Sequence, residues 1–291
     1  MVARILQIIL PVYAIVAGGY LYGRLRRADI AGLNRLNMDV FVPALILSAL
    51  ATKGFDASSN GALVLGGVAV VLGSGLLAWP VARWLDSDPR TFVPPMMFNN
   101  SGNMGLPLAV LAFGEGSLPA AVALFVASNL LHFTLGVWLV RRDAHVGRIL
   151  LSPMVVASVC GAGLGAAGAV LPAWLAVTLK LMGDVAVPLM LFTLGIRMAA
   201  TAVSGWRVGI AGALMRPLAG LAIAMPLGWL LRLGPAQLGM LYVFASLPPA
   251  VLNFLIAEEY RQEPEKVASI VLLGHLASLV FVPLALALAL S

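Results

Sequence analysis

FNNSGNMGLPL, residues 98–108, is a polar, glycine-containing stretch inside an otherwise apolar segment that runs from Phe92 to Phe113. Two glycines and a proline weaken the hydrogen-bond ladder of a helix at this point. If the segment crosses a membrane, each backbone group left unpaired costs several kcal/mol unless protein, water or a ligand meets it. The stretch is therefore expected to be unwound and to line a cavity.

The composition of the chain places this segment in a membrane protein. Of 291 residues, 61% are hydrophobic and 10% are charged, whereas about 25% of the residues in soluble proteins are charged. The apolar residues fall in blocks of about 17 to 25, the length that crosses a hydrocarbon core of about 30 Å. An integral membrane protein is expected, rather than a soluble enzyme.

Charged and Pro/Gly-rich breaks divide the chain into ten candidate spans, separated by loops too short for a soluble domain. The first block ends in Gly18-Gly19-Tyr20 and an arginine cluster without a small-residue cleavage site, so it is expected to be a retained helix rather than a signal peptide. The ten segments are Leu6–Tyr22, Asn34–Leu50, Ala62–Pro80, Phe92–Phe113, Pro119–Val140, Ser152–Leu171, Ala176–Arg197, Arg207–Trp229, Ala236–Ala257 and Lys266–Ala289.

Basic residues indicate the orientation, because Lys and Arg stay on the cytoplasmic side of a membrane. The loops after odd-numbered segments hold most of the 18 basic residues. The other loops and the amino terminus hold little more than Arg4, Lys53, Lys180 and Arg232. Both termini are therefore expected outside the cytoplasm, in a multi-pass protein of the inner membrane.

Several classes of partner are excluded by the same pattern. The net charge of +6 is spread over interhelical loops, so no nucleic acid is expected to bind. The single Cys160 lies among apolar residues and is expected to be a packing residue. Because the chain has only one cysteine, neither a disulfide nor a zinc framework is expected. No nucleotide-binding loop or metal-ligand spacing occurs, so no cofactor and no metal are expected.

An internal repeat divides the chain into two halves. LNMDVFVP at 36–43 recurs as LMGDVAVP at 181–188, an offset of 184 − 39 = 145 residues. The same offset pairs landmarks in other spans: Gly18 with Gly163, Ser101 with Ser246, and Pro119 with Pro264. Each half holds five spans, and because five is odd the second half must be upside down relative to the first. The expected fold is all-α, with inverted five-helix repeats at 1–145 and 146–291 in one membrane unit.

The ninth segment is also interrupted, since residues 246–254 read SLPPAVLNF. Two broken spans at corresponding positions, here the fourth and ninth, indicate where a transporter binds its substrate. Half-helix ends there present free amide groups and a positive dipole end, which favour an anionic group such as a carboxylate. The alternative is that the polar residues only tie helices together. The candidate substrate-binding residues are Asn99, Asn100, Ser101, Asn103, Pro248, Pro249, Asn253 and Arg216.

Ionisable residues inside spans are candidates for function because they are costly there. Arg216 is either a counter-charge for an anionic substrate or the partner of a carboxylate across the bundle. Asp39 and Asp184, each four residues before a proline, are candidates for proton or cation coupling, or braces of a helix. His132 and His275 suit a proton relay, although interhelical hydrogen bonding is the alternative role.

The sequence resembles the auxin efflux carrier family of transporters, as a bacterial member. The resemblance rests on Leu33-Asn34-Arg35 with Val42-Pro43, on Asn100 with Met104-Gly105-Leu106-Pro107, and on the stretch from Leu247-Pro248 to Glu259-Tyr260. It implies two inverted five-helix repeats whose broken fourth and ninth helices cross at the substrate site.

The resemblance also implies a role for Asn100, which matches the asparagine that contacts the substrate carboxylate in plant carriers. Two features depart from those carriers. Asn99 and Asn253 stand where the plant carriers place prolines at the crossing, and the third span, Ala62 to Pro80, lacks their acidic support-site residue. A pocket more polar than that of the auxin carriers is therefore expected.

Secondary transport of a small organic anion by alternating access is the leading functional prediction. The partners expected are this anionic solute and membrane lipid, with proton or sodium coupling and a homodimer left open. An intramembrane enzyme that uses Asp39 and Asp184 as a carboxylate pair is one alternative. A channel is the other.

Overall fold

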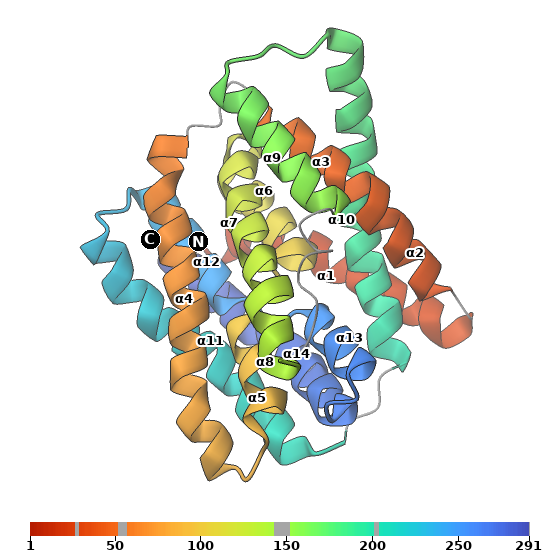
Figure 1. Cartoon of the computed structure of the whole chain (residues 1–291), viewed down its shortest axis with the longest axis vertical. Helices are drawn as coiled ribbons and strands as arrows, with labels where there is room; N and C mark the ends of the chain where they lie inside the picture. Colours follow the sequence, from red (N-terminus) through yellow and green to blue (C-terminus); the bar gives the residue numbers. More distant parts are fainter. Residues whose placement is uncertain (27–28, 52–56, 143–151, 201–203, 291) are drawn as a thin grey trace.

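The computed structural model describes residues 1–26, 29–51, 57–142, 152–200 and 204–290. Every regular element in these ranges is a helix (Figure 1), so the predicted all-α class is confirmed. The one isolated backbone bridge of the described chain joins Asn99 to Pro249. Lys53 and the predicted boundary between residues 145 and 146 lie outside the described residues.

Seven helices of the described chain are long and apolar enough to cross a membrane. Two of them include short π-helical turns, η1 (Asn37–Phe41) and η4 (His132–Gly136). The seven spans are α1 (Val2–Leu25), α2-η1-α3 (Ile30–Leu50), α4 (Ala57–Trp84), η3-α7-η4-α8 (Glu115–Val140), α10 (Ala173–Ala200), α11 (Trp206–Leu230) and α14 (Pro264–Ala289).

The other three of the ten predicted segments are not continuous spanning helices. The fourth is divided into α5 (Pro89–Met97), the π turn η2 (Ser101–Gly105) and α6 (Leu106–Phe113), and the ninth into α12 (Pro235–Ser246) and α13 (Val251–Glu259). The sixth contains α9 (Pro153–Ala166), whose 14 residues reach about 21 Å at 1.5 Å per residue. The described chain therefore has seven continuous spans, the two interrupted segments that were predicted, and one short helix in place of the sixth predicted span.

Prolines explain two of the π turns. Pro43 and Pro107 each follow a π turn by two residues and have no N–H to donate to the carbonyl four residues earlier. The chain widens instead, and the amides of Val42 and Leu106 bond the carbonyls five residues back, on Asn37 and Ser101. A proline therefore accounts for a π turn in two segments that lie far apart in the sequence.

The two interrupted segments cross and complete each other's backbone hydrogen bonds. The amide of Asn100 donates to the carbonyl of Pro248 at 2.8 Å, and the amide of Ala250 donates to that of Phe98 at 2.9 Å. Each bond joins one broken segment to the other. The predicted break in the fourth segment is confirmed at residues 98–100, while residues 101–108 are helical, and the second break lies at residues 247–250 between α12 and α13.

Two buried asparagines reinforce the crossing. Asn99 Nδ2 donates to the Phe244 carbonyl at 2.6 Å. Asn253 Nδ2 donates to the carbonyls of Phe98 at 3.0 Å and Ala250 at 2.9 Å. Each side chain therefore adds a second hydrogen bond to a carbonyl beside a break, which is a bracing role.

The geometry of the crossing corrects one detail of the predicted repeat. Asn99 faces Pro249 in the backbone bridge, and Asn253 lies in the first turn of α13. Ser101 begins η2 after the first break, whereas Ser246 ends α12 before the second, so the offset of 145 does not pair equivalent positions here. The offset still relates Pro119 and Pro264, which both lie in the first turn of a helix.

Helices α1, α3, α9 and α10 form one packed group, and α4, α5, α11, α12 and α14 form another. Figure 1 shows α9 beside α3, and α3 in turn packs on α10. Both chain ends lie at one end of the bundle: Arg4 Nη2 donates to the Ala112 carbonyl, and Ala289 packs with Phe113 around Gly239.

Glycines let the backbones of α1 and α10 touch. A Cβ on Gly19 would lie 2.0 Å from the Phe192 carbonyl oxygen, and a Cβ on Gly195 would lie 2.0 Å from that of Val16. Small residues at a membrane helix interface allow this close packing, which supplies much of the association energy in lipid.

We expect Gly195→Ala to destabilise the purified protein by about 1–3 kcal/mol, the usual cost of an overpacked contact. Thermal unfolding in detergent measures the effect. Gly163→Ala in α9 is the matched control, because a Cβ there meets no atom within 4 Å. Equal melting temperatures for the two variants would contradict the packing of α1 on α10.

We expect Asn253→Leu to destabilise the protein by about 1–3 kcal/mol, because the Phe98 carbonyl loses a bond in a buried site. Asn129→Leu is the control: Asn129 donates to Phe125 of its own helix and is only partly buried. Chemical denaturation of both variants in the same detergent compares them. A larger loss for Asn129→Leu would remove Asn253 as a brace of the crossing.

Candidate substrate site at the helix crossing

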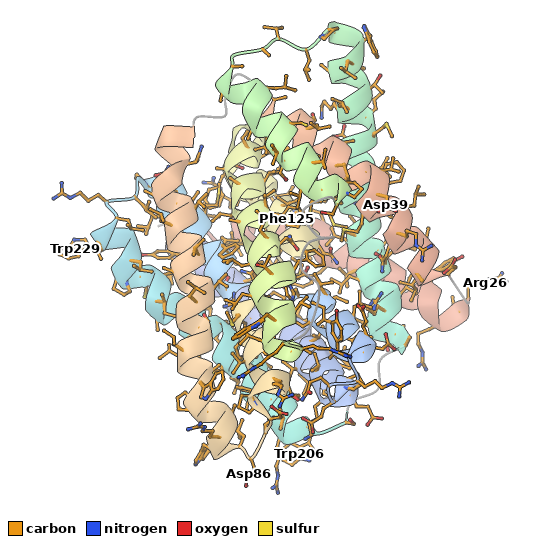
Figure 2. All side chains as sticks on the ribbon, viewed as in Figure 1. Arg26, Asp39, Asp86, Phe125, Trp206 and Trp229 are labelled. Carbon is orange, nitrogen blue, oxygen red and sulfur yellow. The ribbon has the colours of Figure 1, made fainter. Side chains whose placement is uncertain are left out.

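A cavity of about 230 Å³ lies next to the crossing. Asn99, Asn100 and Asn103 of the fourth predicted segment line it together with residues of the second, fifth, sixth, seventh and ninth segments. Two residues of its wall, Asp39 and Phe125, are labelled in Figure 2. The other lining residues are Asn34, Asn37, Met38, Ser101, Gly102, Asn129, Phe133, Ser152, Pro153, Met154, Met190, Thr193, Leu194, Arg197, Ala250, Val251, Leu252 and Leu255.

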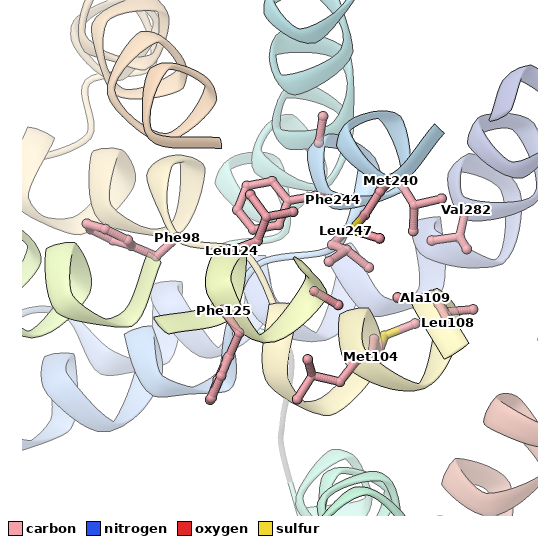
Figure 3. Close-up of a cluster of buried hydrophobic side chains, with 14 of the residues drawn as sticks. Phe98, Met104, Leu108, Ala109, Leu124, Phe125, Met240, Phe244, Leu247 and Val282 are labelled. Carbon is pink, nitrogen blue, oxygen red and sulfur yellow. The ribbon is translucent and has the colours of Figure 1, made fainter. Parts of the chain in front are cut away.

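The cavity lies toward the end of the bundle that carries the basic loops. Its lining residues Asn34, Ser152 and Arg197 adjoin the loops after the first, fifth and seventh predicted segments. Away from the cavity, Met104, Leu108, Phe244 and Leu247 are buried in the hydrophobic cluster of Figure 3. The cavity is therefore bounded by apolar packing on one side of the crossing.

All three π turns contribute to the cavity wall. Asn37, Met38 and Asp39 come from η1, residues 101–103 from η2, and Phe133 from η4. A π turn widens the helix by one residue and often occurs at functional sites. Asp39 in η1 and His132 in η4 were predicted only as candidates for ion coupling, and neither turn was predicted to line the substrate site; the proline at 43 is a signal for the first.

Asn100 is held in one orientation by bonds at both ends of its amide. It is the N-cap of η2, where its Oδ1 accepts from the Asn103 amide at 3.3 Å. Its Nδ2 lies 2.9 Å from His275 Nε2. His275 Nδ1 lies 2.7 Å from the Val271 carbonyl of its own helix. Since a carbonyl only accepts, Nδ1 carries the proton and Nε2 accepts from Asn100.

Helix α14 supports both breaks from behind. A Cβ on Gly274 would lie 2.5 Å from Pro249 Cδ, so the helix directly contacts the second break. The next residue, His275, contacts the first break through Asn100. Two of the residues predicted from separate motifs, Asn100 and His275, are thus brought together.

Two charged residues line the cavity. Asp39 is exposed in η1, and Arg197 lies near the end of α10, where Glu258 interacts with it electrostatically. Arg197 was counted in the sequence only among the basic residues that set orientation. Its position at the end of an apolar span, one turn from several cavity residues of α10, is the signal that could have identified it.

The remaining candidates lie outside the cavity wall. Arg216 is 0% exposed, and its Nη1 donates to the Ala245 carbonyl at 3.2 Å. Pro248, Pro249 and Asn253 form the crossing itself. His132 stacks on Phe98 with ring centroids 4.1 Å apart.

The two repeated aspartates have different surroundings. Asp184 is exposed on α10 and forms an ion pair with Lys180, with N–O distances of 3.1 Å. Asp39 lines the cavity and Asp184 does not. No cluster of three or more metal-ligating side chains occurs among the described residues. Cys160 is exposed, so its predicted role inside the protein packing is wrong.

Comparison with known proteins agrees with this architecture. The sequence model of a family described as membrane transport proteins matches residues 4–146 and 142–286. An uncharacterized transporter of Methanothermobacter thermautotrophicus is 28% identical over 304 residues, which cover 96% of each chain. Both matches indicate a transporter rather than an enzyme, and they confirm the resemblance to the auxin efflux carrier family. The chain belongs to the membrane transport protein family.

Proposed function

We propose that this protein is a secondary transporter that carries a small carboxylate-type anion across the inner membrane by alternating access. One observation carries the proposal: the interrupted helices cross beside a cavity whose wall combines the start of η2, several asparagines and Arg197. Solute sites of secondary transporters are typically formed by such interrupted helices.

The chemistry of the wall suits a carboxylate. Asn100 and Asn103 offer amide groups without a permanent charge, and η2 continues into α6, so that its first amides form the positive end of a helix dipole. Arg197 offers a guanidinium, which binds carboxylates in a two-bond geometry. The volume of about 230 Å³ is below the 300–1,000 Å³ of drug-sized pockets, which favours a solute of few heavy atoms.

The proposed architecture is ten membrane segments as two inverted five-segment repeats, residues 1–145 and 146–291, with both termini outside the cytoplasm. On this orientation the cavity faces the cytoplasm, since it lies toward the basic loops. The group α1, α3, α9 and α10 and the group α4, α5, α11, α12 and α14 are the two bodies expected to move against each other. A homodimer in lipid, a bacterial source and an absence of bound cofactor are further parts of this proposal.

A stability screen against carboxylates tests the substrate class. We expect acetate, lactate, benzoate or succinate to raise the melting temperature of the detergent-purified protein, because binding at 100 times the Kd adds about 2.7 kcal/mol to stability. Methylammonium and glucose are the cationic and neutral controls. Stabilisation by the cation alone, or by none of the acids, would contradict an organic-anion carrier.

Two cavity variants test the residues. We expect Asn100→Ala and Arg197→Gln each to lower the affinity for the stabilising acid, because losing a hydrogen bond to a charged group costs about 1.5–3 kcal/mol. Uptake into proteoliposomes and ligand-dependent melting measure the loss. Arg207→Gln, on the same basic side but outside the cavity wall, is expected to keep wild-type affinity. Unchanged affinity in both cavity variants would place the substrate elsewhere.

A further inference from the structure

We propose that His275 couples proton uptake to anion binding by reversing the amide of Asn100, so that one proton accompanies each anion. The inference rests on the proposed function and names its coupling ion. It follows from a chain of three hydrogen bonds that runs from Val271 through His275 and Asn100 to the amide of Asn103. His275 thus acts on the substrate through Asn100 and is a positioning residue.

Without a ligand the chain is fully satisfied. The Val271 carbonyl fixes the proton of the neutral imidazole on Nδ1, and the bare Nε2 accepts from Asn100 Nδ2. Asn100 Oδ1 then points to Asn103 and accepts from its amide. His275 and Asn100 are each 4% exposed, so little water is present to offer alternative partners. In this state the Asn103 amide is capped and is not available to an anion.

A proton on His275 Nε2 reverses the hydrogen bond to Asn100 and breaks the hydrogen bond between Asn100 and Asn103. The imidazolium has two N–H donors, and Nε2–H now faces the Nδ2 donor of Asn100. The conflict is relieved when the amide turns by half a rotation and presents Oδ1 to His275. The NH₂ group of Asn100 then faces the Asn103 amide, which leaves two donors without an acceptor at the wall of the cavity.

An anion in the cavity supplies the missing acceptor. A carboxylate oxygen that accepts from Asn100 Nδ2 and from the Asn103 amide restores the pairing of both groups. Its negative charge also offsets the buried imidazolium, whose charge is costly in a site without water. The proton comes from water in the cavity and the anion from the same solution. Each therefore favours the binding of the other, and the coupling is reciprocal.

The other charged groups around α14 do not replace this role. Tyr13 of α1 reaches the helix through Ser278, whose hydroxyl donates to the backbone carbonyl of His275 rather than to its ring. Arg216 of α11 donates to the Ala245 carbonyl, and its positive charge adds to the need for an anion. The remaining titratable residues of helices packed against α14 are Arg4, Tyr20, Tyr22, Arg24, Arg90, Arg207, Tyr242, Glu258 and Glu259.

His132 provides a matched control. It is as buried as His275, at 3% exposed, and it stacks on Phe98 at the same crossing. It does not line the cavity and has no hydrogen bond to Asn100 among the described residues. A general effect of a buried histidine at the crossing would therefore be seen in both positions, and the proposed coupling only in His275.

Proton uptake on ligand binding is the test. Calorimetric titrations of the purified protein with acetate, lactate and benzoate in buffers of different ionisation enthalpy give the protons taken up per anion. At about pH 6 to 8 these acids are already ionised, since carboxyl groups titrate near pH 4. We expect wild-type protein and His132→Gln to approach one proton per anion, with affinity rising about tenfold per unit fall in pH. We expect His275→Gln to bind without uptake and without that pH dependence.

Binding by wild-type protein without proton uptake would overturn the inference and leave the proposed carrier function intact. Uptake that persists in His275→Gln would also overturn it. If no acid binds at any pH, the proposed function fails and the coupling fails with it.

A second measurement needs no ligand and no substitution at 275. The chain has 3 histidines, so nitrogen-15 spectra of histidine-labelled protein, assigned with His132→Gln and His145→Gln, isolate the signal of His275. A neutral ring protonated on Nδ1 is expected, and a ring protonated on Nε2 would overturn the inference.

Discussion

The structure depends on one constraint: backbone N–H and C=O groups must be bonded where the membrane provides no water. Interrupting a helix opens several such groups, and here each interrupted segment satisfies those of the other. Asn100 N–H meets the Pro248 carbonyl, and Ala250 N–H meets that of Phe98. The two prolines of the second break, Pro248 and Pro249, reduce the demand because they have no N–H. Neither break is stable alone, so the crossing follows from the presence of both.

The same constraint explains why polar space collects at this place. A π turn leaves carbonyl groups less regularly paired, and the described chain has π turns at η1, η2 and η4, all of which reach the cavity. Elsewhere the spans are regular helices with apolar outer faces. The polar groups that could contact a small solute therefore lie around the irregular backbone. In the neighbouring group of helices, close glycine contacts hold α1 and α10 together.

The breaks could be predicted from the sequence because glycine and proline weaken a helix, and because asparagine is unusual inside an apolar segment. The pairing of Ser101 with Ser246 was wrong, because α12 extends to Ser246 and the constant offset of 145 residues does not account for the longer helix. The contact of Asn100 with His275 joins residues 175 positions apart and depends on how α14 packs. Arg197 was missed as a cavity residue for a similar reason, since a cavity wall is a property of tertiary packing.

Arg216 shows how charge outside the cavity acts on the site. Its guanidinium is fully buried, donates to the last turn of α12, and has Nε and Nη2 without hydrogen-bond partners among the described residues. The C-terminal end of a helix carries a partial negative charge of about half a unit, which balances only part of the cation. The potential at the crossing is therefore positive even though Arg216 does not line the cavity. A positive field of this kind disfavours a cation and favours an anion, whose charge offsets the incompletely balanced arginine.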